Sequence, residues 1–496
     1  MPENDAKTEV HYLRDSLRAM VGWRQNLVDT TVPDGKVMPP LVWEQREKLP
    51  VIGPMVRMKQ ITKDPVGLVR RLAREHREGF TIRVPSTFDF TFLLHEDAYR
   101  LVMSLPATHA AIGQVLDRMP TVGYWFPRSG AGPDSLQELI VAGRRMMAEM
   151  LPHAAMPQFA ERIGGVVDRH VATWGDTVDL TANLYPLVYE ASCRYFTGDR
   201  IWDDLGGELT RLYREIVKGI EITHIAASQT AGRYFMPEYR ATRRLHRLLR
   251  GKLPRYADAD SPLIKAIRRV RIDGMPLSAA DSLWMFMYVL WNATVYPGAY
   301  VYWTLVDVVT RPELVERVHA AEGQAERRDL LARCLLENIR LYPVSSLIRY
   351  LRRPLEYRHD GRDYHIPDGQ MVGVLPGVTN LDPERIPDPH EFDPDRHVDG
   401  PMPREGIFGR GAFGCVAGEF NKTLAATVLD EVLTRYDFRL LGALPQRQLR
   451  VPEIHPTDPL PVRLTPRARP RMALTTETVA PEAETPVARC PFTGAG

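Results

Sequence analysis

The sequence predicts a mainly α-helical protein with a smaller β-rich part. Apolar residues recur at helical spacing over most of the chain from about Glu138 to Leu440. Residues Thr81 to Leu93 alternate between apolar and polar side chains, which predicts a pair of strands. Turn-forming residues at Asp360-Gly361 and at Pro367-Asp368-Gly369 bound further short strands. Helices therefore form the body of the expected fold.

The composition is typical of a globular protein. With 496 residues, of which 44% are hydrophobic and 25% charged, the chain can bury a large core. Its net charge of +2 gives no reason to expect nucleic acid as a partner. The four cysteines are widely separated, which favours a reducing, cytoplasmic compartment over a disulfide scaffold. The N-terminal residues show neither a membrane span nor a signal peptide, so we expect a soluble protein without a membrane anchor.

The two ends of the chain differ from the rest. Residues 1–44 form a leading arm, in which Val10 to Val28 is amphipathic. Acidic residues interrupt its basic face, so we expect this helix to dock on protein and not on a membrane surface. Residues 466–496 contain much Pro, Ala, Thr and Glu and few large apolar side chains, which predicts a disordered tail. We expect Cys490-Pro491, near the end of this tail, to have no role in the site.

A glycine-rich loop carries the most informative cysteine. Cys415 lies seven residues after Phe408 and four after Gly411, and an apolar helical pattern follows from Glu419 to Leu433. Glycines allow the backbone to approach a flat ligand closely. A thiolate just before a helix is stabilised by the positive end of the helix dipole. This arrangement suits a thiolate ligand to the iron of a porphyrin.

A second motif lies in the preceding helical pattern, Asp329 to Leu341. Glu337 and Arg340 are three residues apart there and can form an ion pair on one helix face. If this pair is buried, it needs further hydrogen-bond partners. The segment Pro389 to Arg396 lies between this helix and the cysteine loop.

These motifs, taken in order, resemble those of the cytochrome P-450 superfamily. The Glu-x-x-Arg helix, the β-rich insert from Pro343 to Pro376, the segment ending at Arg396 and the cysteine loop follow one another over roughly residues 335 to 420. The resemblance covers about residues 45–465 as one catalytic unit. It also implies that Arg396 is the third member of a structural triad with Glu337 and Arg340. It implies the cytochrome P-450 fold, in which a haem lies between a long distal helix and a proximal cysteine loop and helix.

The resemblance implies haem b as the cofactor, with the Cys415 thiolate as axial ligand of the iron. It places Arg144 and Arg349 at positions that pair with the haem propionates. The chain departs from the family pattern at Phe413 and at Ile140, where basic side chains are usual. Propionate pairing would then be less complete, or other groups such as Arg410 would contribute. The expected cofactor-binding residues are Cys415, Phe408, Gly411, Phe413, Arg144 and Arg349.

The distal helix shows the largest departure. The apolar run from Leu277 to Val309 resembles the family's central helix, where an Ala-Gly-x-acid-Thr pattern supplies an acid and an alcohol for proton delivery. Here the corresponding residues are Ala293-Thr294-Val295-Tyr296-Pro297, so Tyr296 replaces the acid and Pro297 the alcohol. A proline inside a helix removes one N–H donor and frees the carbonyl four residues earlier, which belongs to Ala293. In a shifted register, Thr294 could act as the alcohol.

Three classes of function follow from this resemblance. The first is a monooxygenase that receives electrons from a ferredoxin or flavodoxin. The second is a peroxygenase, or an isomerase or dehydratase acting on a substrate peroxide, and it needs no electron donor. Superfamily members of this second class resemble this chain because they also lack the acid–alcohol pair. The third is a non-catalytic haem carrier or sensor. We favour the monooxygenase, with a medium-sized, mostly apolar organic substrate of specialised metabolism. The expected pocket residues are Tyr124, Trp125, Ile222, Tyr296 and Leu347.

Overall fold

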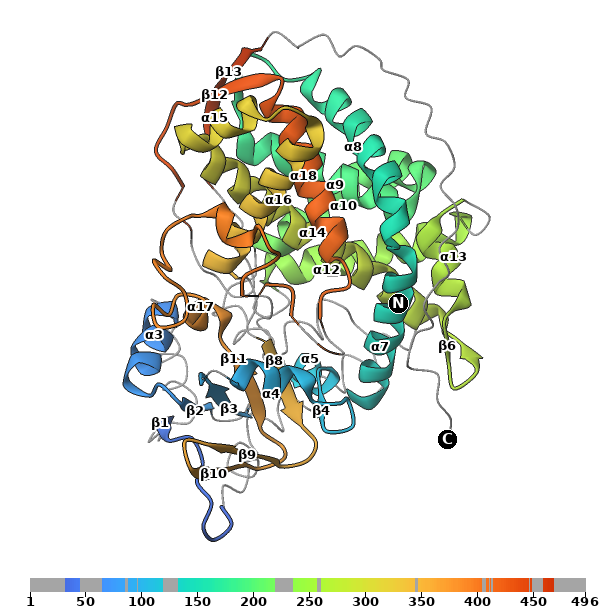
Figure 1. The fold of residues 1–496 in the computed structure, drawn as a ribbon. Coiled ribbons are helices and arrows are strands. Elements are labelled where there is room, and N and C mark those ends of the chain that lie inside the picture. The colour runs from blue at the N-terminus through green and yellow to red at the C-terminus, as the bar shows by residue number, and fades with distance from the viewer. Residues whose placement is uncertain are drawn as a thin grey trace, which may run out of the picture.

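The computed structural model confirms a mainly helical fold with smaller sheets (Figure 1). The structure describes residues 32–44, 65–84, 88–95, 97–118, 133–218, 235–256, 260–343, 347–403, 407–409, 411, 414–445, 447 and 458–467.

The longer helices follow one another through the middle of the chain. They are α3 (Pro65–Glu75), α7 (Pro133–Met150), α8 (Met156–Val171), α9 (Leu180–Thr197), α10 (Asp199–Lys218), α12 (Pro237–Lys252), α13 (Pro262–Arg269), α14 (Ala279–Val309), α15 (Pro312–Ala320), α16 (Gln324–Leu341) and α18 (Gly418–Leu433). Shorter helical segments are α4 (Ala98–Ser104), α5 (Gly113–Arg118), η1 (His153–Ala155), η3 (Leu253–Tyr256), α17 (Pro376–Thr379) and η4 (Pro394–His397).

Helix α14 forms the centre of the helical part. The Ser278 hydroxyl caps its start by accepting a hydrogen bond from the backbone N–H of Asp281, at 3.0 Å. Its apolar residues surround the whole helix, as expected of a helix buried on all sides. It packs mainly against α9, α16 and α18, and Figure 1 shows it among these helices. The predicted long, buried helix is therefore confirmed.

The main sheet has the strand order β1-β2-β3-β11-β8-β4. The predicted strand pair is confirmed, because β2 and β3 run antiparallel with Phe80 opposite Phe92. The last four residues of the expected N-terminal arm form β1, which pairs with β2. The strands of this sheet are β1 (Leu41–Glu44), β2 (Gly79–Val84), β3 (Phe88–Leu93), β4 (Ala110–Ala111), β8 (Leu347–Leu351) and β11 (Met371–Val374).

Smaller sheets complete the fold. The predicted turn at Asp360-Gly361 joins β9 to β10, and both residues have positive φ angles, +46° and +72°, which suit a tight hairpin turn. Pro461–Pro466, at the end of the expected catalytic unit, forms β13 between β12 and β5. These strands are β5 (Thr177–Asp179), β6 (Arg271–Ile272), β7 (Met275–Pro276), β9 (Leu355–His359), β10 (Arg362–Ile366), β12 (Tyr436–Leu440) and β13 (Pro461–Pro466).

Candidate functional site

The cysteine loop leads directly into helix α18. The backbone N–H of Cys415 donates to the carbonyl oxygen of Phe408 at 2.5 Å, which closes the loop. The ring of Phe408 packs beside Gly418, since a Cβ atom there would lie 3.4 Å from the ring. Gly411 has a φ angle of +66°, and a Cβ atom on it would overlap the carbonyl oxygen of Met103. The loop therefore needs a glycine at residue 411.

Among the described cysteines, Cys415 is the accessible one. Cys193 and Cys334 are buried, and burial raises the pKa of Cys334 to about 12. Cys415 is exposed to solvent, although many protein atoms lie around its thiol. Burial raises the pKa of its thiol, while a hydrogen bond from the Ala417 backbone N–H and the charge of Arg144 oppose this rise. A bound metal cation would favour the thiolate strongly, which fits the role of an iron ligand.

Two arginines from distant elements lie near each other, and one of them contacts this loop. Arg144, on α7, donates to the carbonyl oxygen of Gly414, the residue before the cysteine. Arg349, on β8, is 2% exposed and donates to the carbonyl oxygen of Ile348 at 2.8 Å. Burial is the main cause that lowers the pKa of Arg349 to about 10, and the positive charge of Arg144 is the second. Two neighbouring cations at a buried site favour an anionic ligand, and the two propionates of a haem fit that requirement.

Helix α14 reaches the same region. Tyr288 lies on this helix, and burial raises the pKa of its phenol. Arg144 lowers that pKa and Cys415 raises it further, so both groups lie close enough to act on the phenol electrostatically. The structure therefore brings together α7, the central helix and the cysteine loop. Tyr288 was not a candidate in the sequence, because it is one aromatic residue among many in an apolar helix.

Glu337 and Arg340 form a fully buried ion pair. Arg340 Nε and Nη2 each donate to one carboxylate oxygen of Glu337 at 2.7 Å, and neither side chain is exposed. The other donors of Arg340 reach backbone carbonyl oxygens of Asn380, Pro389 and Glu391 at 2.8–3.1 Å. These carbonyl groups, and not a third side chain, satisfy the guanidinium.

His397 contacts Glu337 more closely than the expected third member, Arg396, does. Arg396 Nε lies 3.6 Å from the carboxylate, whereas His397 Nε2 lies 3.0 Å from it. The backbone N–H of Met402 donates to His397 Nδ1 at 2.9 Å, so the proton of the neutral ring lies on Nε2 and points to Glu337. His397 immediately follows Arg396 in the sequence, but a lone histidine at the end of a short 3-10 helix, η4, carries no periodic signal that would identify it.

The distal helix accommodates Pro297 without ending. Pro297 lies inside α14, and the carbonyl oxygen of Ala293 accepts a hydrogen bond from the hydroxyl of Ser192 on α9. Thr294 is fully buried, and its hydroxyl donates to the carbonyl oxygen of Leu290 at 2.7 Å. The proton of that hydroxyl is therefore used within the helix. Tyr296 is half-buried beside the core.

Of the expected pocket residues, the structure describes Tyr296 and Leu347, the first residue of β8. Phe413, Arg410, Tyr124, Trp125 and Ile222 lie outside the described residues.

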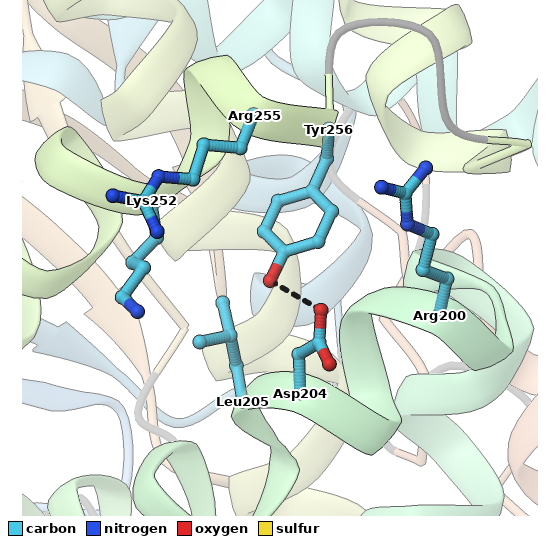
Figure 2. A pocket seen from close by; sticks show the side chains of 6 residues that line it. All are labelled: Arg200, Asp204, Leu205, Lys252, Arg255 and Tyr256. Carbon is cyan, nitrogen blue, oxygen red and sulfur yellow. Dashed lines mark hydrogen bonds between the residues drawn. The ribbon is translucent and has the colours of Figure 1, made fainter.

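A separate hollow of about 280 Å³ lies between the start of α10 and the segment after α12 (Figure 2). The hydroxyl of Tyr256 donates to Asp204 at 2.8 Å, and Arg200 lies over the tyrosine ring. The charged side chains do not suit an apolar substrate, and none lies on an element that positions Cys415. The lining residues are Arg200, Asp204, Leu205, Lys252, Arg255 and Tyr256.

Comparison with known protein families and solved structures identifies this fold. The family model described as "Cytochrome P450" matches residues 299–443, which contain part of α14, the Glu337–Arg340 pair and the cysteine loop. The chain belongs to the cytochrome P-450 superfamily. A structure titled "Retinoic acid bound cyanobacterial CYP120A1" superposes with a TM-score of 0.68 at 18% identity, covering 82% of this P-450 and 96% of that chain. At this identity the superposition shows a shared fold.

Curated relatives of this P-450 are similar over most of their length. The sterol 14alpha-demethylase of Mycobacterium tuberculosis is 22% identical over 77% of this chain and 89% of its own. The lanosterol 14-alpha demethylase of Macaca fascicularis is 22% identical, with 83% of each protein covered. The obtusifoliol 14-alpha demethylase of Sorghum bicolor is 21% identical, covering 80% of this chain and 85% of its own.

The relatives are enzymes by name, and this P-450 is an oxidoreductase of the superfamily. The carrier or sensor alternative is therefore not favoured. Members of the superfamily hold haem through a cysteine thiolate. Within the described part of the chain, no helix is both long enough and apolar enough to cross a lipid bilayer.

Proposed function

We propose that this P-450 is a haem-thiolate monooxygenase in which Cys415 is the axial ligand of the iron. The observation that carries the proposal is the accessible Cys415 thiol, in the loop just before α18 and within electrostatic reach of Arg144. Bound haem would supply the redox chemistry that activates dioxygen. The Ala417 N–H would stabilise the thiolate, and Arg144 and Arg349 would hold the two propionates.

The proposed substrate is a medium-sized, mostly apolar organic molecule, and specialised metabolism is the proposed setting. The apolar character of α14 beside the site supports this, because its buried side chains exclude water. The named relatives act on sterols and obtusifoliol, and the superposed structure holds retinoic acid. At 18–22% identity, these ligands belong in an assay panel together with terpenes and polyketides. A ferredoxin or flavodoxin is the proposed electron donor.

Spectroscopy tests the ligand. The ferrous carbonyl form of the full chain should show the strongly red-shifted Soret band of thiolate ligation. Replacing Cys415 by alanine should abolish that band, whereas the matched control Cys490→Ala should keep it. A thiolate-type spectrum in Cys415→Ala would overturn the assignment.

The oxygen donor needs a separate experiment, because the distal helix lacks the usual acid and alcohol. Pro297 has no hydroxyl, and the Thr294 hydroxyl is used within the helix. Purified protein should be assayed on the panel with ferredoxin, reductase and nicotinamide cofactor, and separately with hydrogen peroxide alone. We expect product with the electron supply. Product with peroxide and none with the electron supply would instead establish the peroxide-using alternative.

A further inference from the structure

Pro297 creates a local defect in the hydrogen bonding of α14. Its nitrogen carries no proton, so the carbonyl oxygen of Ala293, four residues earlier, loses its helical donor. A buried carbonyl group without a partner is costly, and Ala293 is 4% exposed. The helix nevertheless continues from Ala279 to Val309, so another group must compensate.

Ser192 on the neighbouring helix α9 provides this compensation. Its side chain is fully buried, and its hydroxyl donates to the carbonyl oxygen of Ala293. Serine and threonine hydroxyls inside helices commonly bond to the carbonyl oxygen four residues earlier in their own helix. Thr197, also on α9, does so, with its hydroxyl 2.9 Å from the carbonyl oxygen of Cys193. Ser192 instead donates across the interface to α14.

The two helices approach closely at this point. A Cβ atom on Gly298, the residue after the proline, would lie 2.9 Å from the ring of Tyr189 and 3.0 Å from the ring of Tyr185. Both tyrosines are on α9 and are buried. The absence of a side chain at residue 298 thus lets α9 approach the part of α14 where the carbonyl of Ala293 needs a donor.

We propose that Ser192 is a positioning residue for the distal helix. It supplies the hydrogen-bond donor that Pro297 removes, and so determines the orientation of residues 293–296 beside the site. Because Ala293 and Tyr296 belong to one helical turn, a shift of the Ala293 peptide group would also shift the Cα–Cβ bond of Tyr296, from which the phenol extends. The catalytic consequence for Tyr296 rests on the proposed function, whereas the hydrogen-bond compensation does not.

A double-mutant cycle of Ser192→Ala and Pro297→Ala tests this inference. With proline at 297, Ser192→Ala leaves the Ala293 carbonyl unpaired, and the folding equilibrium constant should fall by about 5–150-fold. With alanine at 297, the backbone N–H returns and can donate to that carbonyl, so Ser192→Ala should have much less effect. Urea unfolding of the full-length holoprotein, followed by far-UV circular dichroism, measures both effects.

The matched control is Thr197→Val, which removes another buried hydroxyl from α9. Thr197 does not contact α14 through this hydroxyl, so its effect should be equal in the two backgrounds. An equal effect of Ser192→Ala in both backgrounds would overturn the proposal, because a packing role does not depend on residue 297. If Ser192→Ala does not accumulate as folded protein, recovery in the double variant supports the proposal and continued failure refutes it.

A spectroscopic measurement separates positioning from stability. The electron paramagnetic resonance spectrum of the ferric holoprotein should change in Ser192→Ala, since the distal helix turn moves, and should return toward wild type in the double variant. Thr197→Val should leave the spectrum unchanged. An unchanged spectrum in Ser192→Ala would refute the positioning role even where stability falls. The unfolding comparison between the two backgrounds needs no assignment of the iron ligand or of the reaction, so it stands if the proposed function fails.

Discussion

Replacement of Glu337 by glutamine should destabilise the fold strongly, although this residue lies in a network apart from Cys415. Glutamine keeps the shape of the side chain and removes its charge. The carboxylate accepts two hydrogen bonds from Arg340 at 2.7 Å, one from His397 at 3.0 Å and one from the backbone N–H of Asp393 at 3.0 Å. The substitution therefore leaves a buried guanidinium without its counter-ion.

The structure sets the size of this effect. Hydrogen bonds to charged groups contribute about 1.5–3 kcal/mol each, but they do not add, because the amide oxygen of glutamine retains part of the network. Breaking a buried ion pair by removing one partner costs about 3–5 kcal/mol, and we expect this range for Glu337→Gln. Asp395→Asn is the matched control. Asp395 pairs with Arg317 and Arg333 but is half exposed, so its loss should cost about 0–1 kcal/mol.

The pH dependence gives an independent measurement. Burial alone would raise the pKa of Glu337, but hydrogen bonds from Arg340, His397 and Asp393 together lower it below its ordinary value of 4.5. The stabilisation is therefore complete above about pH 4.5 and is lost as the pH falls through the lower, folded-state pKa. Urea unfolding should show a constant gap between wild type and Glu337→Gln from pH 7 to about pH 5, and a smaller gap in more acidic buffer. A cost no larger than that of Asp395→Asn would show that the buried Glu337–Arg340 pair does not make this contribution to stability.

Three further substitutions test the site itself. Arg349→Gln should lower haem affinity by about 10–100-fold, since its buried guanidinium lies near Arg144 and would pair with a propionate; haem titration measures this. Gly411→Ala should impair haem incorporation far more than Gly361→Ala, since both have positive φ angles but only the former overlaps a neighbouring backbone; the haem-to-protein absorbance ratio measures this. Tyr296→Phe should reduce turnover by about 10²–10⁴-fold if the phenol donates a proton, and full activity with both oxidants would show that the ring only packs.

Much of the fold was predictable because its signals are local. The strand pair around Phe80 and Phe92 follows from alternation, and the hairpin turn at Asp360-Gly361 follows from residues that tolerate positive φ angles. The long buried helix follows from an apolar run with a serine cap at Ser278. In each case, neighbours in the sequence determine the local conformation, so no knowledge of distant contacts was required.

The partners of the buried polar groups were not predictable in the same way. The sequence identified Glu337 and Arg340 but not His397, and it identified the freed carbonyl of Ala293 but not its donor, Ser192. Ser192 is 101 residues from Ala293 in the sequence, and one serine inside an apolar helix has no distinctive pattern. Such pairs form because a buried polar group must find a donor or acceptor wherever the fold brings one near.

The sequence alone was enough to predict the superfamily, the long central helix, the strand pair, the cysteine in its glycine-rich loop and the proline in the distal helix. These depend on residue type and short spacing, which act through local backbone geometry. The folded structure was needed to show that Cys415 is the accessible thiol among the described cysteines, that His397 contacts Glu337, and that α9 supplies a donor to α14. Electrostatic coupling, burial and hydrogen bonding depend on distances in space, and these follow from how the elements pack together.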